Sequence, residues 1–179
     1  MSAKNQVAVF GGGCFWCTEA IFQSLRGVIN ARPGYAGGTK KDPSYEEVSS
    51  GKTGHAEVTR IEYDPASISY DDLLTVFFAT HDPTSLNRQG NDLGTQYRSA
   101  IFYSNEEQKA KAEEYIKKLN AESAKPIVTE VKPLDDFYEA EDYHRNYFLT
   151  HQDESYCRFV IAPKLEHLRE RFKNLIRAA

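Results

Sequence analysis

The chain has 179 residues, a formal net charge of −4 at pH 7 and a hydrophobic content of 40%. This composition is typical of a single globular domain over residues 1–179 with room for a core. The acidic balance argues against a nucleic-acid partner, and no apolar run of the sequence is long enough for a membrane span. Because the N-terminal segment lacks an apolar secretory region, we expect a cytoplasmic protein.

Apolar runs and helical stripes alternate along the first half of the chain. Residues 6–10 predict a short buried strand, and residues 18–28 carry apolar side chains near helical spacing. Residues 53–65 predict a second strand, which stops at an Asp-Pro pair. Residues 69–81 carry an apolar helical stripe and begin with a serine suited to capping a helix.

The second half continues the alternation. Residues 99–104 predict a strand, 105–120 a helix and 126–131 another strand, and a last helical stripe runs from Pro163 to Leu175. The pattern favours an α+β fold, a two-layer sandwich with helices packed on a mainly antiparallel sheet and a helical C-terminal tail. Because no apolar stripe is left over for a partner chain, we expect a monomer.

Two segments, residues 30–54 and 81–98, read as irregular because they are rich in Gly, Pro, Asn and Asp. Loops of this length in a compact domain are usually functional or disordered. Their aromatic residues Tyr35, Tyr45 and Tyr97 favour a functional role.

The three cysteines are Cys14, Cys17 and Cys157. Cys14 follows three glycines at the expected junction of a strand and a helix, where unpaired N–H groups and the helix dipole stabilise a thiolate. We therefore expect the pKa of Cys14 to be lowered and its nucleophilicity raised. Cys17 lies three residues further on the same helical face, at a spacing that allows a disulfide.

Other interpretations of these cysteines stay open. A zinc site would need four ligands, whereas Cys157 and His55 are isolated in the sequence. A structural disulfide is unusual in a reducing compartment, and inert buried thiols are a further possibility. The setting of glycines, strand and helix favours redox or nucleophilic chemistry without a metal or other cofactor. Two alternatives stay open: a general thiol-disulfide oxidoreductase that uses Cys14 and Cys17, and a zinc-binding interaction module.

Glu57 is a candidate proton donor. On a strand its side chain shares a face with Thr59 and Ile61, and no basic residue lies on that face. Burial there would raise the pKa of Glu57 and keep its carboxyl protonated. The alternative is a carboxylate in water at the end of a strand.

The segment at residues 89–99 offers two more polar candidates. Its glycines mark tight turns, and Asp92 can bond nearby backbone amides. Such a loop can present Tyr97 as a fixed hydroxyl donor. The alternative is that Tyr97 packs beside the strand that follows.

Together these segments resemble the peptide methionine sulfoxide reductases of the A type. The matching motifs are "GGGCFWCTEA", "GYAGG", "YEEVSSGKTGHAEV", "YDP", "HDPTSLNRQGNDLGTQYRSAIFY" and "AEDYHRNY…YC", which cover roughly residues 7–160. The resemblance implies a ferredoxin-like core. It also implies reduction of the S epimer of methionine sulfoxide, in proteins and as the free amino acid, with thioredoxin or a similar dithiol as the reductant.

The resemblance also implies a role for each matching residue. Cys14 matches the catalytic cysteine, which attacks the sulfoxide and becomes a sulfenic acid. Glu57 matches the acid that protonates the sulfoxide oxygen. Phe15 and Trp16 match two aromatics of a pocket for the S-methyl group. Tyr45 and Tyr97 match two hydroxyl donors to the oxygen, and Asp92 matches an acidic residue that supports their hydrogen-bond network.

The chain departs from the common family pattern at residue 17, where most members have glycine and a smaller branch has cysteine. Two thiols can therefore resolve the sulfenic acid, Cys17 and Cys157. A bridge from Cys14 to Cys17 across one helical turn strains disulfide geometry, which favours Cys157 slightly. His81, His144 and His151 receive no catalytic role and are expected to be structural or at the surface.

Overall fold

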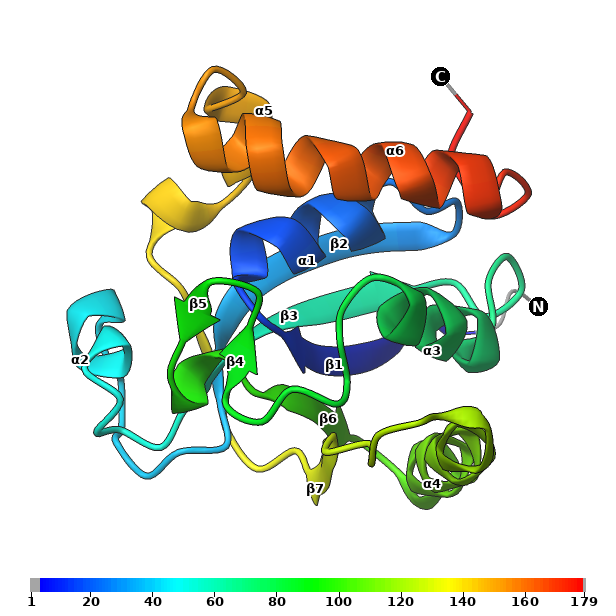
Figure 1. Ribbon diagram of the computed structural model, residues 1–179, viewed down its shortest axis with the longest axis horizontal. Coiled ribbons are helices and arrows are strands. Elements are labelled where there is room, and N and C mark those ends of the chain that lie inside the picture. Colours follow the sequence, from blue (N-terminus) through cyan, green and yellow to red (C-terminus); the bar gives the residue numbers. More distant parts are fainter. Residues whose placement is uncertain (1–3, 179) are drawn as a thin grey trace.

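A mixed, mostly antiparallel sheet of six strands forms the centre of the molecule (Figure 1). It is seen in a computed structural model that describes residues 4–178. In the order β7-β6-β1-β3-β2-β8, only the edge pair β6–β7 of this sheet is parallel. The strands are β1 (Gln6–Gly12), β2 (Val28–Ala36), β3 (Ala56–Tyr63), β6 (Ser99–Tyr103), β7 (Glu130–Pro133) and β8 (Phe137–Glu139).

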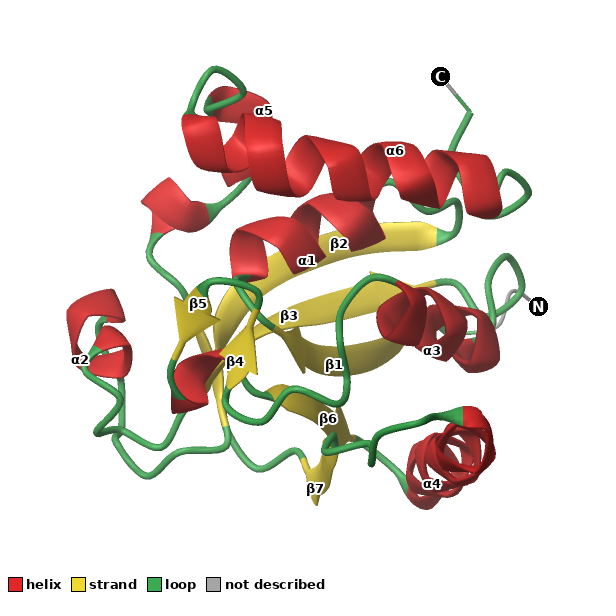
Figure 2. Cartoon of the chain, in the orientation of Figure 1, coloured by secondary structure: helices red, strands yellow, loops and turns green. Residues whose placement is uncertain are grey.

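Helices and short turns complete the fold (Figure 2). The helices are α1 (Phe15–Gln23), α2 (Tyr45–Ser49), α3 (Tyr70–Ala79), α4 (Glu106–Glu122), α5 (Tyr147–Thr150) and α6 (Ala162–Arg171). A separate two-stranded hairpin joins β4 (Arg88–Gln89) to β5 (Asp92–Leu93), and a π-helical turn, Cys157–Ile161, precedes α6. Helix α1 lies between the sheet and α6 (Figure 1).

The alternation of strand side chains places one core on each face of the sheet. Ile61 and Tyr63 of β3 face the main core with α1, α3 and α6, whereas Val58 faces a smaller core on the opposite side. A hydrogen bond of 2.7 Å between the hydroxyls of Thr18 and Thr59 ties α1 to β3. The face of β3 that carries Glu57 is therefore the one covered by α1.

Two predicted elements show local signals that the structure confirms. Ser69 caps α3 in a capping box, since its hydroxyl accepts a hydrogen bond from the N–H of Asp72 and the Asp72 carboxylate accepts one in return. Helix α4 begins after Asn105, whose side chain caps it. These capped ends lie where the apolar periodicity predicted them.

The prediction that residues 30–54 are irregular is wrong in part. Strand β2 continues to Ala36 because it pairs with β3 along its length and with β8 near its end, and this pairing outweighs the unfavourable Pro33 and Gly34. Helix α2 forms after a capping box that Ser44 and Glu47 make. Residues 81–98 are mainly irregular, as predicted, apart from short elements.

Some predicted boundaries also shift. The helix expected at residues 18–28 begins earlier, at Phe15, and ends at Gln23, because Val28 already belongs to β2. The strand expected at residues 126–131 begins later, at Glu130, where pairing with β6 starts. Element ends are decided by pairing partners that sequence periodicity does not reveal.

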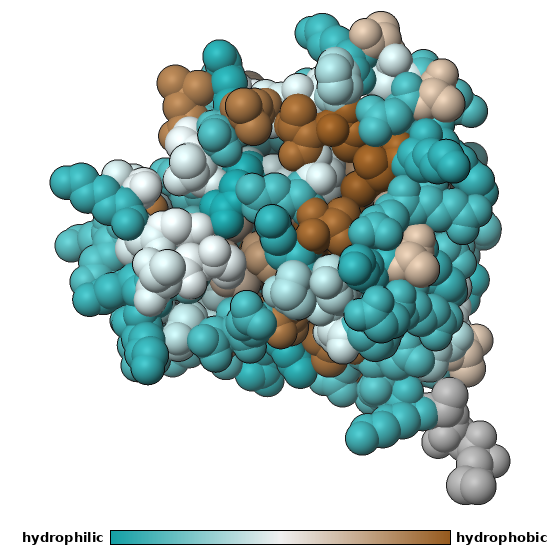
Figure 3. Space-filling model, turned by 90° about the horizontal axis from the view of Figure 1, so that it is seen from below, coloured by the Kyte–Doolittle hydropathy of each residue, from teal (hydrophilic) through white to brown (hydrophobic). Residues whose placement is uncertain are grey.

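No helix among residues 4–178 combines the length and apolarity that crossing a bilayer requires. The N-terminal residues 1–3, part of the segment interpreted as lacking a secretory region, lie outside the described residues. On the face seen in Figure 3, hydrophobic side chains gather in a band bordered by hydrophilic ones.

Candidate active site

Cys14 is the N-cap residue of α1, at the junction with β1, which ends two residues earlier, as the sequence predicted. The chain makes this turn through Gly13, whose φ of +97° lies in the left-handed region. A Cβ atom at Gly13 would also approach the Gln89 side chain to 2.7 Å. Glycine is therefore required here, both for the backbone conformation and for space.

The prediction of a lowered pKa for Cys14 is wrong for this structure. Burial raises the pKa of Cys14 well above its usual range, and Glu57 and Cys17 raise it further when they are ionised. The N–H of Trp16 at the helix start and the hydroxyl of Tyr156 lower it, but they do not outweigh burial. Cys14 is therefore a thiol in the resting protein.

Glu57 lies on β3 beside Cys14, and its side chain is only 1% exposed. The N–H of Phe15 donates a hydrogen bond of 3.1 Å to its Oε1 atom, while Oε2 is buried without a protein partner. Burial raises the pKa of Glu57 to about 8, against the lowering effect of the Phe15 N–H, and the charge of Asp92 raises it further. The carboxyl is thus protonated at neutral pH, as predicted.

Two tyrosine hydroxyls lie close enough to Glu57 and Cys14 to be affected by their charges. Tyr45 is the first residue of α2, and Tyr97 ends a 3-10 turn at Thr95–Tyr97. Burial raises the pKa of Tyr45 to about 12, and the charges of Glu57 and Cys14 add to this effect. The pKa of Tyr97 is raised by burial and by the same two charges. Both phenols therefore stay protonated and can donate hydrogen bonds.

The ring of Phe15 is fully buried in an aromatic cluster. Its centroid lies 5.7 Å from that of Tyr35 and 6.3 Å from that of Tyr45. The Tyr35 hydroxyl donates to a carboxylate oxygen of Glu141 at 2.9 Å, and the Tyr45 N–H donates to the other at 2.9 Å. Glu141 thus holds the start of α2 against the cluster.

Trp16 is fixed by residues that sequence reasoning left without a role. Its indole N–H donates to Nδ1 of His144 at 3.0 Å, and its ring stacks on Tyr147 with centroids 3.7 Å apart. His144 is completely buried, with burial lowering its pKa, so it is neutral at neutral pH. The one sequence signal for His144 was its place in the motif "AEDYHRNY".

Buried Glu19 on α1 is a second residue that the sequence analysis missed. Its carboxylate accepts a hydrogen bond of 3.0 Å from the N–H of Asn146, immediately before α5. Burial raises the pKa of Glu19 to about 7, against the lowering effect of the N–H groups of Asn146 and Tyr147. Glu19 therefore anchors the segment that brings Tyr147 onto Trp16.

Cys14 and Cys17 line a common cavity of about 210 Å³. Asp92 from β5 and Lys164 from α6 also line it, together with Tyr156. The Tyr156 hydroxyl donates a hydrogen bond of 2.8 Å to Asp92 Oδ2 and lies 3.7 Å from the sulfur of Cys17. The structure thus places Asp92 on the Cys17 side of the site.

Cys157 is 0% exposed in the main core and does not line this cavity. It begins the π-helical turn before α6. All three cysteines are free thiols. Cys157 interacts with Cys17 closely enough to affect its pKa.

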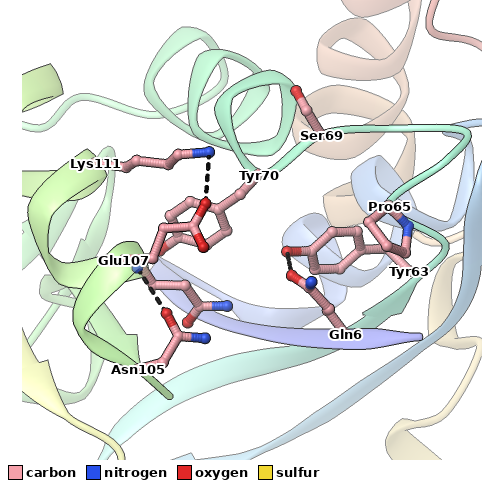
Figure 4. Close-up of a pocket in the computed structure, with 9 residues that line it drawn as sticks. Gln6, Tyr63, Pro65, Ser69, Tyr70, Asn105, Glu107 and Lys111 are labelled. Atoms are coloured by element: carbon pink, nitrogen blue, oxygen red, sulfur yellow. Dashed lines mark hydrogen bonds and ion pairs between the residues drawn. The ribbon is translucent and has the colours of Figure 1, made fainter. Parts of the chain in front are cut away.

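A second cavity, of about 170 Å³, contains none of the predicted site residues (Figure 4). Tyr63 donates to the Gln6 side chain there at 2.9 Å, and Lys111 forms an ion pair with Glu107. No cluster of three His, Cys, Asp or Glu side chains suited to a metal ion occurs among residues 4–178.

Comparison with known proteins matches residues 6–176 to the peptide methionine sulfoxide reductase family. The MsrA protein of Picrophilus torridus is 55% identical over 169 residues, covering 94% of this chain and 96% of the relative. A crystal structure of reduced Mxr1 from Saccharomyces cerevisiae has a TM-score of 0.82 at 33% identity, covering 86% of this chain and 90% of that chain.

Mxr1 is also known in complex with Trx2. That structure has a TM-score of 0.58 at 22% identity and covers 80% of this chain and 85% of that chain. At this identity the similarity shows a shared fold alone. The family match and the relative from Picrophilus both extend over nearly the whole chain, and the matched residues 6–176 span the cysteine, the buried carboxyl and the tyrosines described above. The chain therefore belongs to the peptide methionine sulfoxide reductase family, MsrA.

Proposed function

We propose that the chain reduces the S epimer of methionine sulfoxide, in proteins and as the free amino acid, through a cycle on Cys14. The observation that carries this proposal is the protonated Glu57 carboxyl beside Cys14, with Oε2 buried and unpaired. A sulfoxide becomes a good electrophile when its oxygen receives a proton, and a neutral carboxylic acid supplies one. Thiol–disulfide exchange does not require protonation of an oxygen atom, so the alternative of a general dithiol oxidoreductase does not require this acid.

In the first step, Glu57 gives its proton to the sulfoxide oxygen while the Cys14 sulfur attacks. Glu57 then takes up the proton of the Cys14 thiol, so its own protonation state is restored. Methionine leaves, and the oxygen remains on Cys14 as a sulfenic acid. The hydroxyls of Tyr45 and Tyr97 donate hydrogen bonds to the oxygen while charge develops on it.

Phe15 and Trp16 form the apolar wall for the S-methyl group. Both residues follow Cys14 on the first turn of α1, and the His144 hydrogen bond and the Tyr147 stack support the Trp16 plane. A fixed apolar surface beside the nucleophile orients the substrate sulfur toward it. Asp92 raises the pKa of Glu57 through its charge and so helps to keep the acid protonated.

In the second step, Cys17 resolves the sulfenic acid. Its position in the same cavity as Cys14 supports this choice over Cys157, which is buried outside the cavity. The strain of a bridge across one helical turn, which favoured Cys157, would make the Cys14–Cys17 disulfide easier to reduce. Thioredoxin or a similar dithiol would then restore both thiols by exchange, as the complex of Mxr1 with Trx2 suggests for that relative.

We also propose the ferredoxin-like core that the resemblance implies. The chain length supports a single domain over residues 1–179, and the absence of a leftover apolar stripe supports a monomer. The sheet order β6-β1-β3-β2, with α1 after β1 and α3 after β3, supports that core because it is the antiparallel arrangement of a β-α-β-β-α-β unit. Cys14 follows the end of β1, and Glu57 lies on β3, which pairs with β1.

The test incubates the purified chain with each separated epimer of methionine sulfoxide and dithiothreitol. We expect methionine from the S epimer alone, and none after Cys14→Ser. Replacing dithiothreitol by thioredoxin and its reductase should sustain turnover. Full activity of the Cys14→Ser variant, or reduction of a disulfide substrate without any methionine formation, would contradict the proposal.

A further inference from the structure

The Tyr156 hydroxyl joins a cysteine to a carboxylate. It lies 3.7 Å from Cys17 Sγ and donates to Asp92 Oδ2 at 2.8 Å. A phenol has one hydrogen, and here that hydrogen is given to Asp92, so the phenol oxygen is left to accept from the Cys17 thiol. The hydrogen bonds therefore run in one direction, from Cys17 through Tyr156 to Asp92.

These groups meet in the cavity that Cys14 also lines. The Tyr156 ring stands edge-on to Trp16, with centroids 5.9 Å apart. This contact helps to hold the hydroxyl between Asp92 on the β4–β5 hairpin and Cys17 on α1. The groups around Cys17 that titrate or carry charge are Cys14, Asp92, Tyr156, Cys157 and Lys164.

Cys17 needs a route for its proton. Burial raises the pKa of Cys17, against the lowering effect of the Lys164 charge, so Cys17 is a thiol at neutral pH. With only 2% of its surface exposed, it has little direct access to water. Asp92 is only partly buried, so it connects the cavity to solvent.

We propose that Tyr156 relays the proton of Cys17 to Asp92 when Cys17 resolves the sulfenic acid, an inference that rests on the proposed function. The Cys17 S–H proton passes to the Tyr156 oxygen as the Tyr156 proton passes to Asp92. The Cys17 sulfur bonds to the Cys14 sulfur, and the S–O bond of the sulfenic acid breaks. The leaving hydroxyl takes up one proton from solvent and departs as water, and Asp92 later releases to solvent the proton that it received, so the protons balance. The Cys17 sulfur is oxidised and the Cys14 sulfur is reduced, so no other reactant is needed.

The test measures disulfide formation after a single turnover with methionine sulfoxide, in a Cys157→Ala background where only Cys17 can resolve. The rate is followed by loss of dimedone-reactive sulfenic acid across pH values. With Tyr156 present, we expect a rate that changes little between about pH 6 and pH 8. Tyr156→Phe should slow the step about a hundredfold at neutral pH and make its rate rise about tenfold per pH unit, since hydroxide must then remove the proton.

Two further variants keep the test independent of folding. Asp92→Asn retains a hydrogen-bond acceptor for Tyr156 but removes the charged proton acceptor, and it should give the same steep pH dependence. Tyr63→Phe is the matched control, because it deletes one hydroxyl bonded to Gln6 in the remote cavity of Figure 4. It should leave the rate and its pH profile unchanged.

The outcomes separate the relay from the function on which it rests. If no disulfide forms in the Cys157→Ala background with Tyr156 present, the assignment of Cys17 fails and the relay fails with it. If the disulfide forms there and Tyr156→Phe leaves the rate and the pH profile as they were, the relay alone is overturned.

Discussion

The two sides of Cys14 are built from different parts of the fold. The acid side holds Glu57 on β3, a strand paired with both β1 and β2. The thiol side holds Cys17 with Asp92, which comes from a two-residue strand outside the main sheet, and Tyr156, which precedes a π-helical turn. In the proposed mechanism, proton donation to the substrate therefore relies on the sheet, and thiol exchange relies on loops and the C-terminal segment.

This difference suits the two steps. A donor for a transient charge must be held in place before the reaction, and a doubly paired strand does this well. Resolution and reduction need sulfur atoms to meet and a second dithiol to reach them, so short elements with fewer backbone bonds are better suited. Changes on the acid side should lower the rate of methionine formation, whereas changes on the thiol side should lower recycling.

The largest expected effect is on the thiol side. Cys17→Ser should abolish thioredoxin-supported turnover and leave Cys14 as a sulfenic acid, because the thiol that shares its cavity is gone. Cys157→Ala should keep most of the turnover. Counting free thiols after one equivalent of substrate checks both variants. A disulfide formed in the Cys17→Ser protein would show that Cys157 resolves the sulfenic acid, as the sequence analysis slightly favoured.

The next effect is on the acid side. Glu57→Gln should lower single-turnover methionine formation by about 100- to 1,000-fold at neutral pH, because an amide does not supply the proton. In the wild type the acid is lost as the pH rises through about 8, the pKa that burial gives Glu57. Stopped-flow measurement against pH checks both statements. An unchanged rate in the Glu57→Gln protein would remove the acid from the mechanism.

The tyrosine hydroxyls should have a smaller effect on the same side. Tyr45→Phe and Tyr97→Phe should each lower the first step about tenfold, the usual value of one hydrogen bond that strengthens as charge develops. Tyr138→Phe, which lies on the edge strand β8, is the control. Single-turnover rates check the comparison, and equal rates for all three variants would argue against hydroxyl donation to the oxygen.

The last prediction concerns stability, not rate. The folded protein keeps Glu57 protonated up to about pH 8, whereas an ordinary glutamate loses its proton near pH 4.5. Between these values the unfolded state binds fewer protons, so rising pH lowers the free energy of unfolding by about 1.4 kcal/mol per pH unit through this group. Urea unfolding of wild type and Glu57→Gln at several pH values should show this difference, and parallel curves would contradict it.

The sequence alone predicted much of the fold where local signals were strong. The stripe and cap of α3 depend on neighbours within one helix turn, so Ser69 could be identified without knowledge of the rest. The second half of β2 had no such signal, since Pro33 and Gly34 are poor strand residues and only pairing with β3 makes them part of a sheet. Pairing is a long-range contact, and periodicity does not contain it.

For the site, the sequence by itself determined which groups are chemically able to act: Cys14 at a helix start and Glu57 on a strand face without a basic partner. Only the tertiary structure decided their protonation, because desolvation depends on what packs around a group, and it made Cys14 a thiol where the helix start alone predicted a thiolate. It also decided that His144 supports Trp16 and that Tyr156 stands between Cys17 and Asp92, since these partners are more than sixty residues apart in the chain and meet only on folding.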